Sequence, residues 1–371
     1  MNAVDSAYAD ASPSNRIFRL LEQGRERQAS DLHVEPGHGV AYRIFTHIER
    51  STGQAPDTAE VSAFLDATVD RVSRARLDKI GVADAVYADD RVGSIRIHAS
   101  RGKHGPRLAI RFLARSIPEF ESLALPEIIG SFTDLRSGLV LVAGPTGSGK
   151  STTIASLLDR INATAGKHIV TFEDPIEYQH RWLGSVVTQY EVGRDVSSFA
   201  DGVRGALRAD PDVLFIGELR GVETVSACLQ AAETGHVVFA ALHTPSETPQ
   251  AINRIIGLFP SEEQHNARTR LADALRAVIG LRLLPLLDGS GLRAAAEVMV
   301  ANDAIRRLIR DGATHQLRGV ISSSRKEGMQ TLETHLSDLV SSGDIDIASA
   351  RAASQYAEEI KDSPIPSYRR R

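Results

Sequence analysis

A glycine-rich segment near the middle of the chain, residues 144–152, restricts the fold more than any other feature. Its sequence, Gly-Pro-Thr-Gly-Ser-Gly-Lys-Ser-Thr, matches the pattern GxxxxGK[ST] of a Walker A loop. Residues 138–143 before it form an apolar run typical of a buried parallel strand, and residues 151–160 after it are expected to form a helix. A strand, a phosphate-binding loop and a helix in this order predict an α/β domain.

The loop residues suit the binding of a nucleoside triphosphate together with Mg²⁺. Glycines let successive N–H groups turn toward a phosphate, and the helix N-terminus adds a partial positive charge. We expect Lys150 to reach the β- and γ-phosphates and the Ser151 hydroxyl to bind Mg²⁺. The whole loop is predicted to contact the nucleotide: Gly144, Pro145, Thr146, Gly147, Ser148, Gly149, Lys150, Ser151 and Thr152.

The amino-acid composition indicates a globular protein and argues against several other classes. The chain has 371 residues, 42% of them apolar and 24% charged, which is ordinary globular material for more than one domain. Its single cysteine, Cys228, excludes a disulfide framework and a four-cysteine zinc site within one chain. No apolar stretch approaches the ~20 residues that cross a bilayer, so we expect a cytoplasmic protein that reaches a membrane only through partners. A formal net charge of −4 argues against a nucleic-acid partner.

The pattern changes along the chain from one domain type to another. Residues 15–113 mix short alternating strands (31–34, 40–45, 94–98 and 107–113) with helical stretches near residue 15 and over 58–77, which predicts an α+β domain. A linker is expected at 114–126, and disordered ends at 1–14 and in the basic tail, 362–371.

Residues 127–361 are predicted to form the nucleotide-binding domain. Four continuous apolar runs (139–143, 168–172, 213–216 and 237–242) alternate with helices and predict a mostly parallel sheet covered on both faces. After Pro260 we expect helices as far as about Lys361.

Acidic residues and histidines follow these predicted strands. Glu218 ends a Walker B strand and is the candidate catalytic base, with a simple strand cap as the alternative. Glu173 and Asp174 follow the run 168–172, and strand ends of a parallel sheet meet at one edge, so all three carboxylates are expected near the γ-phosphate.

Two histidines enclose the run 237–242. We predict that His243 emerges beside the phosphates as a γ-phosphate sensor. His236, at the opposite end of the same strand, is the weaker candidate for nucleotide binding. Neither belongs to a His/Cys cluster with metal-ligand spacing.

Taken in order, these stretches resemble the secretion-superfamily ATPases of the PilT type, motors that drive retraction of type IV pili. The four family boxes are present as Walker A (144–152), an Asp box (171–178), Walker B (212–218) and a His box (234–244). Residues 30–33, 206–212 and 231–236 are also similar to family sequence. The resemblance covers about 27–361 and is strongest from Gly138 onward.

The resemblance implies a homohexameric ATPase. Each subunit would pair a PAS-like N-terminal domain with a RecA-like ATPase domain, and ATP would lie between the two. Glu218 would be the catalytic glutamate, with Glu173 and Asp174 acting on water and Mg²⁺, partly through water. Arginines of the N-terminal domain would reach the phosphates; Arg96 and Arg115 match best and Arg111 is a third candidate, with surface arginines as the alternative.

Two features favour the retraction branch. One cysteine cannot build the tetracysteine zinc loop usual in extension and type II secretion ATPases. Residues 304–313, Ala-Ile-Arg-Arg-Leu-Ile-Arg-Asp-Gly-Ala, resemble the retraction motif AIRNLIREGK, although Arg307 and Ala313 depart from it, as do Gly221 and Ser94 from other family positions.

The main alternative is a type IVB secretion or conjugation ATPase of the DotB/TraJ kind, which residues 198–208 and 125–129 resemble. A nucleic-acid translocase and a nucleotide-dependent assembly scaffold are less favoured. For a motor, the expected partner is an inner-membrane platform protein of a pilus or secretion machine.

Overall fold

The chain divides into two compact units, Met1–Ser116 and Ile117–Arg371. The computed structural model describes residues 16–44, 47–113, 116–244 and 247–361. The ends expected to be disordered, 1–14 and 362–371, lie outside the described residues, as does the candidate Arg115.

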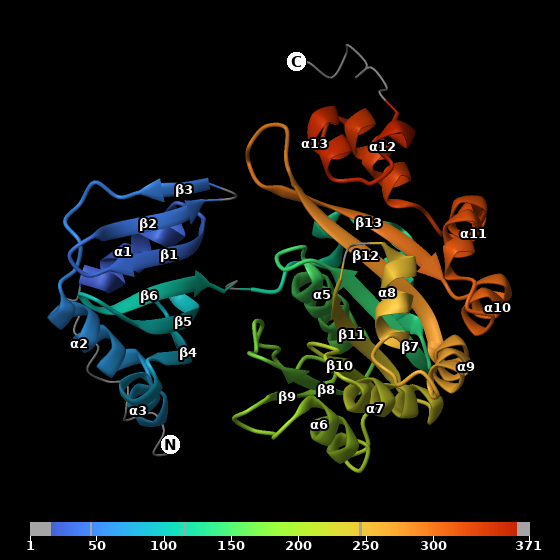
Figure 1. The fold of residues 1–371 in the computed structure, drawn as a ribbon, viewed down its shortest axis with the longest axis horizontal. Coiled ribbons are helices and arrows are strands. Elements are labelled where there is room, and N and C mark those ends of the chain that lie inside the picture. Colours follow the sequence, from blue (N-terminus) through green and yellow to red (C-terminus); the bar gives the residue numbers. More distant parts are fainter. Residues whose placement is uncertain (1–15, 45–46, 114–115, 245–246, 362–371) are drawn as a thin grey trace. The chain divides into compact units, whose positions relative to one another are not determined.

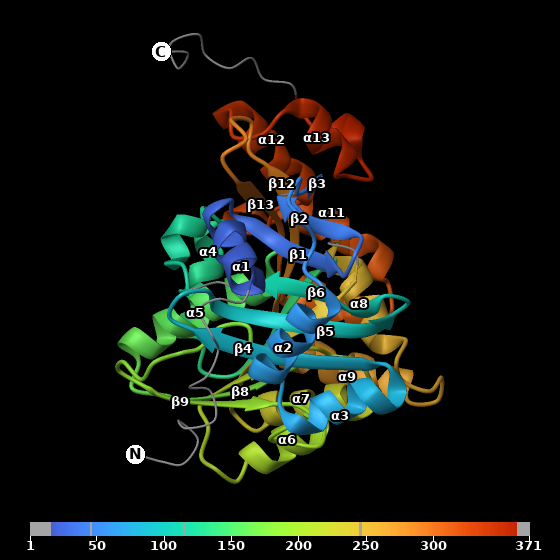
Figure 2. The same ribbon diagram turned by 90° about the vertical axis from the view of Figure 1, so that its left-hand side faces the viewer.

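The first unit is a six-stranded antiparallel sheet with helices on one face (Figure 1). The strand order is β3-β2-β1-β6-β5-β4, and Figure 2 shows β6, β5 and β4 running side by side. Apolar side chains of α1 and α2 pack against alternate residues of the strands, forming one core. The elements are α1 (Arg16–Glu26), β1 (Ala29–Glu35), β2 (Gly39–Ile44), β3 (His47–Arg50), α2 (Thr58–Thr68), α3 (Arg71–Ile80), β4 (Val82–Asp89), β5 (Gly93–Gly102) and β6 (Gly105–Phe112).

The predicted helix over 58–77 is wrong as a single element, because α2 ends at Thr68 and Asp70 caps a second helix within the range. Asp57 and Glu60 form a capping box at the start of α2. Asp70 then accepts hydrogen bonds from the N–H groups of Val72 and Ser73 and starts α3. Val72, in the first turn of α3, is 80% exposed.

The second unit contains a seven-stranded sheet in the order β13-β12-β7-β11-β10-β8-β9, parallel except for β13. The predicted fold class, an α+β domain followed by an α/β domain with a mostly parallel sheet, is confirmed. The strands are β7 (Gly138–Gly144), β8 (His168–Glu173), β9 (Val186–Glu191), β10 (Val213–Ile216), β11 (Val237–His243), β12 (Leu275–Pro285) and β13 (Leu292–Val300). The α-helices are α4 (Glu127–Ser131), α5 (Lys150–Thr164), α6 (Phe199–Ala206), α7 (Val222–Glu233), α8 (Thr248–Ile256), α9 (Gln264–Ala274), α10 (Asp303–Arg310), α11 (Leu317–Ser323), α12 (Leu332–Ser342) and α13 (Ile347–Ala352).

Helices cover both faces of this sheet, which explains its continuous apolar strands. Helices α4 and α5 pack on one face, and α6 to α11 on the other (Figure 1). Short 3₁₀ turns complete the unit: η1 (Phe120–Leu123), η2 (Phe132–Asp134), η3 (Thr314–Gln316), η4 (Arg325–Glu327) and η5 (Ala357–Glu359). Within the predicted linker, Phe120 and Leu125 are buried in the core beside α5.

The expectation of helices throughout the region after Pro260 is wrong for residues 275–300. There β12 and β13 form a hairpin that extends the sheet beside β7, and helices resume only at Asp303. A short apolar run such as Val278–Leu281 fits a buried helix and a buried strand equally well. Pairing with β7 decides in favour of the strand, since it satisfies the backbone hydrogen bonds.

Candidate active site

The predicted site residues gather at the carboxyl edge of the parallel sheet. The Walker A loop leaves β7 at Gly144, and His243 ends the neighbouring strand β11, where the two residues are paired. Glu218 follows β10, the next strand, and Glu173 ends β8 beyond it. Because all four strands are parallel, four segments far apart in the sequence meet at one edge.

The loop is tightly built around its glycines. Gly147 and Gly149 have φ of +77° and +94°, and a Cβ added at Gly144 would lie 2.3 Å from Ser148 Oγ. The Ser148 hydroxyl is buried without a hydrogen-bond partner among the described residues. A phosphate oxygen would satisfy this hydroxyl, so the loop fits the group that its sequence predicts.

Lys150 is held inside the loop. Its ammonium donates to the carbonyl oxygens of Gly144 and Pro145 at 2.9 and 2.8 Å, and to His243 Nδ1 at 3.3 Å. Burial lowers its pKa to about 8, against the opposing attraction of Glu177 and Glu218. The ammonium is thus mostly charged at neutral pH and can exchange these carbonyls for phosphate oxygens.

His243 lies between Lys150 and Glu218. Because Nδ1 accepts from Lys150, the imidazole proton is on Nε2, which lies 3.9 Å from Glu218 Oε2. Burial, followed by the nearby Lys150 charge, lowers the pKa of His243. A neutral imidazole with its N–H toward the site suits the predicted role of phosphate sensor.

Glu218 is paired with an arginine that our sequence predictions did not include. Arg220 Nη2 lies 2.7 Å from Glu218 Oε2, and Arg220 Nη1 lies 3.5 Å from Asp174 Oδ2. This guanidinium links the Walker B and Asp box segments and partly neutralises both acids. Its place two residues after Glu218 is the sequence signal that could have found it.

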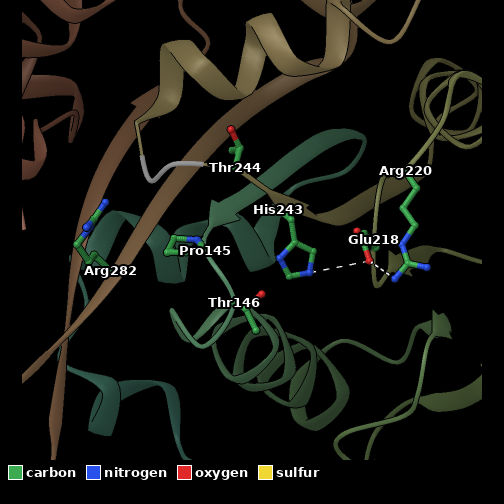
Figure 3. A pocket seen from close by; sticks show the side chains of 7 residues that line it. All are labelled: Pro145, Thr146, Glu218, Arg220, His243, Thr244 and Arg282. Carbon is green, nitrogen blue, oxygen red and sulfur yellow. Dashed lines mark ion pairs between the residues drawn. The ribbon is translucent and has the colours of Figure 1, made fainter. Parts of the chain in front are cut away.

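A pocket of about 650 Å³ opens at these residues. Figure 3 shows His243 between Thr146 and Glu218, with Arg220 beyond Glu218 and Arg282 on the far side of Pro145. Thr244 and Arg282 are further lining residues absent from our predictions. The pocket therefore runs from Glu218 and Arg220 across the Walker A loop to Arg282.

Glu173 is turned into the protein. It accepts hydrogen bonds from Thr171 Oγ1 at 2.7 Å and Gln189 Nε2 at 3.1 Å, and it is 7% exposed. Burial raises its pKa to about 7 despite these bonds.

The hydroxyls of Thr152 and Tyr178 are 2.8 Å apart, which ties the helix after the loop to the Asp box.

Not every predicted residue lies at this edge. His236 precedes β11 at the opposite edge of the sheet, where its Nδ1 lies 2.9 Å from the Ala231 carbonyl oxygen. The seven residues of β11 separate His236 from the Walker A loop of the same chain. Arg96 and Arg111 are cross-strand neighbours in the first unit, 4.0 Å from Asp84 and 3.0 Å from Asp31 respectively.

No group of three or more His, Cys, Asp or Glu side chains in the described part of the chain is arranged to hold a metal ion. In the same residues, no helix is both long and apolar enough to span a bilayer.

Comparisons with known proteins identify the family of this chain. A family model described as type II/IV secretion system protein matches residues 9–362. The chain is 36% identical to the type IV pilus retraction ATPase PilT of Pseudomonas aeruginosa over 344 residues, which cover 93% of this chain and 99% of the relative. It is 40% identical to a twitching motility protein of Neisseria gonorrhoeae over 269 residues, 72% of each chain.

Solved structures show the same fold. The crystal structure of the pilus retraction motor PilT with bound ADP matches with a TM-score of 0.82 at 38% identity, covering 92% of this chain and 98% of that one. The ATPase DotB of Legionella pneumophila matches with a TM-score of 0.78 at 25% identity, covering 91% and 94%. The chain therefore belongs to the type II/IV secretion system protein family and is a PilT-like ATPase.

Proposed function

We propose that this protein is a motor that uses ATP hydrolysis to retract type IV pili. The observation that carries the proposal is the pocket in which His243 and the Glu218–Arg220 pair converge beside the Walker A loop, with Lys150 3.3 Å from His243. Similarity to PilT along almost the whole of both chains supports the choice of pilus retraction.

The residues divide the chemistry among them. Lys150 and the loop N–H groups would hold the β- and γ-phosphates, and Glu218 would accept a proton from the attacking water. His243 would donate its Nε2–H toward the γ-phosphate. Arg220 keeps Glu218 and Asp174 partly neutralised, which lowers their repulsion of the triphosphate.

Mg²⁺ would be held by Ser151, with Glu173 and Asp174 acting partly through water. The ion supplies charge neutralisation at the phosphates when it is bound. Ser151 lies in the first turn of α5, directly after Lys150, which is where a P-loop hydroxyl serves this purpose.

The working form we propose is a homohexamer. In it, arginines of the N-terminal unit would add positive charge to the phosphates, with Arg96 and Arg115 as the first candidates and Arg111 as the third. The ring would act on the cytoplasmic side of the inner membrane, held there by a platform protein of the pilus machine.

Deleting the gene in its own host tests this proposal. A retraction motor predicts loss of twitching motility with more pili on the surface, because assembly continues without disassembly. The wild-type gene restores motility and a Lys150→Ala gene does not.

The DotB-like alternative predicts the opposite pattern. Pili and motility stay unchanged, and secretion or conjugation is lost instead. The lower identity to DotB, 25% against 38% for PilT, makes this the second choice.

A further inference from the structure

A glutamine on β9, Gln189, uses both ends of its side-chain amide to hold the buried carboxylate of Glu173 and the chain that follows it. Its Nε2 donates to Glu173 Oε1 at 3.1 Å and to the Tyr178 carbonyl oxygen at 2.8 Å. Its Oε1 accepts from the backbone N–H of His180 at 2.9 Å. One side chain thus bonds the end of strand β8 to two points on the turn that follows this strand.

The register of the sheet explains why these groups meet. Gln189 is paired with Thr171 on the neighbouring strand β8, and Glu173 lies two residues further along that strand. Residues two apart on a strand point to the same face of a sheet, and so do register partners on adjacent strands. Thr171 Oγ1 accordingly donates to the same oxygen, Glu173 Oε1, at 2.7 Å. Two side-chain donors therefore fix the orientation of a carboxylate that is 7% exposed.

The turn that Gln189 holds also reaches the helix of the Walker A loop. The Tyr178 hydroxyl lies 2.8 Å from the Thr152 hydroxyl. Thr152 is the last residue of the Walker A loop and lies in the first turn of α5. A continuous series of hydrogen-bonded residues therefore runs from Glu173 through Gln189 and Tyr178 to the start of α5.

We propose that Gln189 is a positioning residue for hydrolysis: it acts through Glu173, by fixing the position of that carboxylate relative to the Walker A helix α5. This rests on the proposed function, in which Glu173 acts at the phosphates. Loss of the Gln189 amide leaves the Walker A loop in place to bind ATP, so the effect is expected on kcat more than on KM.

The first test removes the donors to Glu173 separately, in steady-state ATPase assays on the full-length protein. Gln189→Met keeps the length of the side chain without its hydrogen bonds, and we expect kcat to fall about 10-fold with KM for ATP changed less than about 3-fold. Thr171→Val keeps the shape of the side chain and removes only the hydroxyl that bonds Glu173, so kcat should fall about 3-fold or more. The valine variant also keeps the proposal testable if the methionine variant does not fold.

Thr188→Val is the matched control. Thr188 precedes Gln189 on β9, so its side chain points to the opposite face of the sheet, where its hydroxyl lies 3.2 Å from His168 Nε2. His168 begins β8, at the edge of the sheet away from the Walker A loop. We expect this variant to melt at a lower temperature with kcat unchanged. A kcat loss in Thr188→Val as large as in Thr171→Val, or an unchanged kcat in folded Gln189→Met, would overturn the proposal.

A double-mutant cycle with Glu173→Gln separates positioning from a general loss of stability. If Gln189 acts through Glu173, Gln189→Met lowers the single-turnover rate of ATP hydrolysis about 10-fold in the wild-type background. In a protein that already carries Glu173→Gln, the same substitution lowers the rate less than about 2-fold. A merely structural role would lower both rates by the same factor, and that result would contradict the proposal.

Amide hydrogen exchange on nucleotide-free protein gives a readout independent of catalysis. Because the His180 N–H donates to Gln189, residues 176–180 should exchange about 10-fold faster in Gln189→Met than in the wild type, with α9 unchanged. In Thr188→Val these residues should exchange as in the wild type. Equal exchange in Gln189→Met and the wild type would contradict the anchoring itself. If the wild type hydrolysed no ATP, the proposed function would fail, while this measurement would still decide whether Gln189 holds the turn.

Discussion

At the scale of single residues, the site depends on how charges are paired. Arg220 binds Glu218 and reaches Asp174, and Lys150 donates to His243, so each acid and base has a partner before any nucleotide arrives. Paired groups keep their positions in the open pocket and need little rearrangement when the triphosphate enters.

Replacing Arg220 by alanine should weaken catalysis through binding. Without the guanidinium, Glu218 and Asp174 present more negative charge to the triphosphate, so we expect KM for ATP to rise about 3- to 10-fold. Arg220→Lys keeps the charge and should recover part of the loss. Steady-state kinetics measure this effect. An unchanged KM for ATP in the alanine variant would show that the Arg220–Glu218 ion pair is irrelevant to ATP binding.

Glu173 should give the enzyme a pH dependence near neutrality. Its pKa of about 7 means that the carboxylate, which we propose acts on water and Mg²⁺, forms as the pH rises, so kcat should increase from pH 6 to 8. In Glu173→Gln this rise should disappear together with most of the activity. A wild-type kcat that is flat over this range would be inconsistent with the assignment.

The same pKa shift has a consequence for stability. The folded state holds the Glu173 proton more tightly than the unfolded state, so stability falls as the pH rises from about 4.5 to 7. Glu173→Gln stays neutral and should melt above the wild type at pH 8, with little difference at pH 4.5. Thermal melts at the two pH values check the sign.

The sequence predicted much of this site because its chemistry occurs in short, continuous stretches. The Walker A loop and Glu218 each follow an apolar run, and the parallel sheet brings them together. Arg220 was missed although it lies two residues after Glu218, because its pairing with that carboxylate is seen only in the structure. Arg282 carries no local signal, because it joins the pocket only through the position of β12 in the sheet.

At the scale of elements, close packing between α6 and β8 supports the strand that ends in Glu173. Gly202 on α6 lies against the Phe172 ring, and an added Cβ would lie 2.5 Å from that ring. At Gly205, on the same helix, an added Cβ would have no atom of the described residues within 4 Å beyond the helix's own backbone and its chain neighbours. Close packing therefore requires a glycine at position 202 of this helix, whereas it does not at position 205.

These glycines provide a matched pair of substitutions. Gly202→Ala should destabilise the protein by about 1–3 kcal/mol, because Phe172 must move. Gly205→Ala should stabilise it by about 0.5–1 kcal/mol, because alanine favours the helix and meets no obstacle. Urea unfolding of both variants tests this, and the same sign for both would refute the packing argument.

Strands that form only because they pair with a distant part of the chain were harder to predict from the sequence. The β12–β13 hairpin was expected to be helical, and β3, β4 and β9 were not predicted at all. Three of these strands, β3, β4 and β9, lie at sheet edges, where one side is unpaired and the alternation of apolar residues is weak. In contrast, β7 and β10 are fully buried and stand out in the sequence.

At the scale of the whole molecule, the proposed ring should make activity depend on assembly. If arginines of the N-terminal units complete the sites only in the hexamer, ATPase activity per subunit rises with protein concentration, in step with the molar mass from light scattering. Glu218→Gln serves as the control and should assemble in the same way without hydrolysis. Full activity in a monomer at every concentration would exclude the ring as the active form.

The most direct measurement of the central claim, that Glu218 activates water in this pocket, is phosphate release by purified wild type and Glu218→Gln. The wild type should release phosphate from ATP with Mg²⁺, and the variant should be slower by about 10²-fold or more while binding ATP with similar affinity. A Glu218→Gln protein that hydrolyses ATP at the wild-type rate would contradict the account.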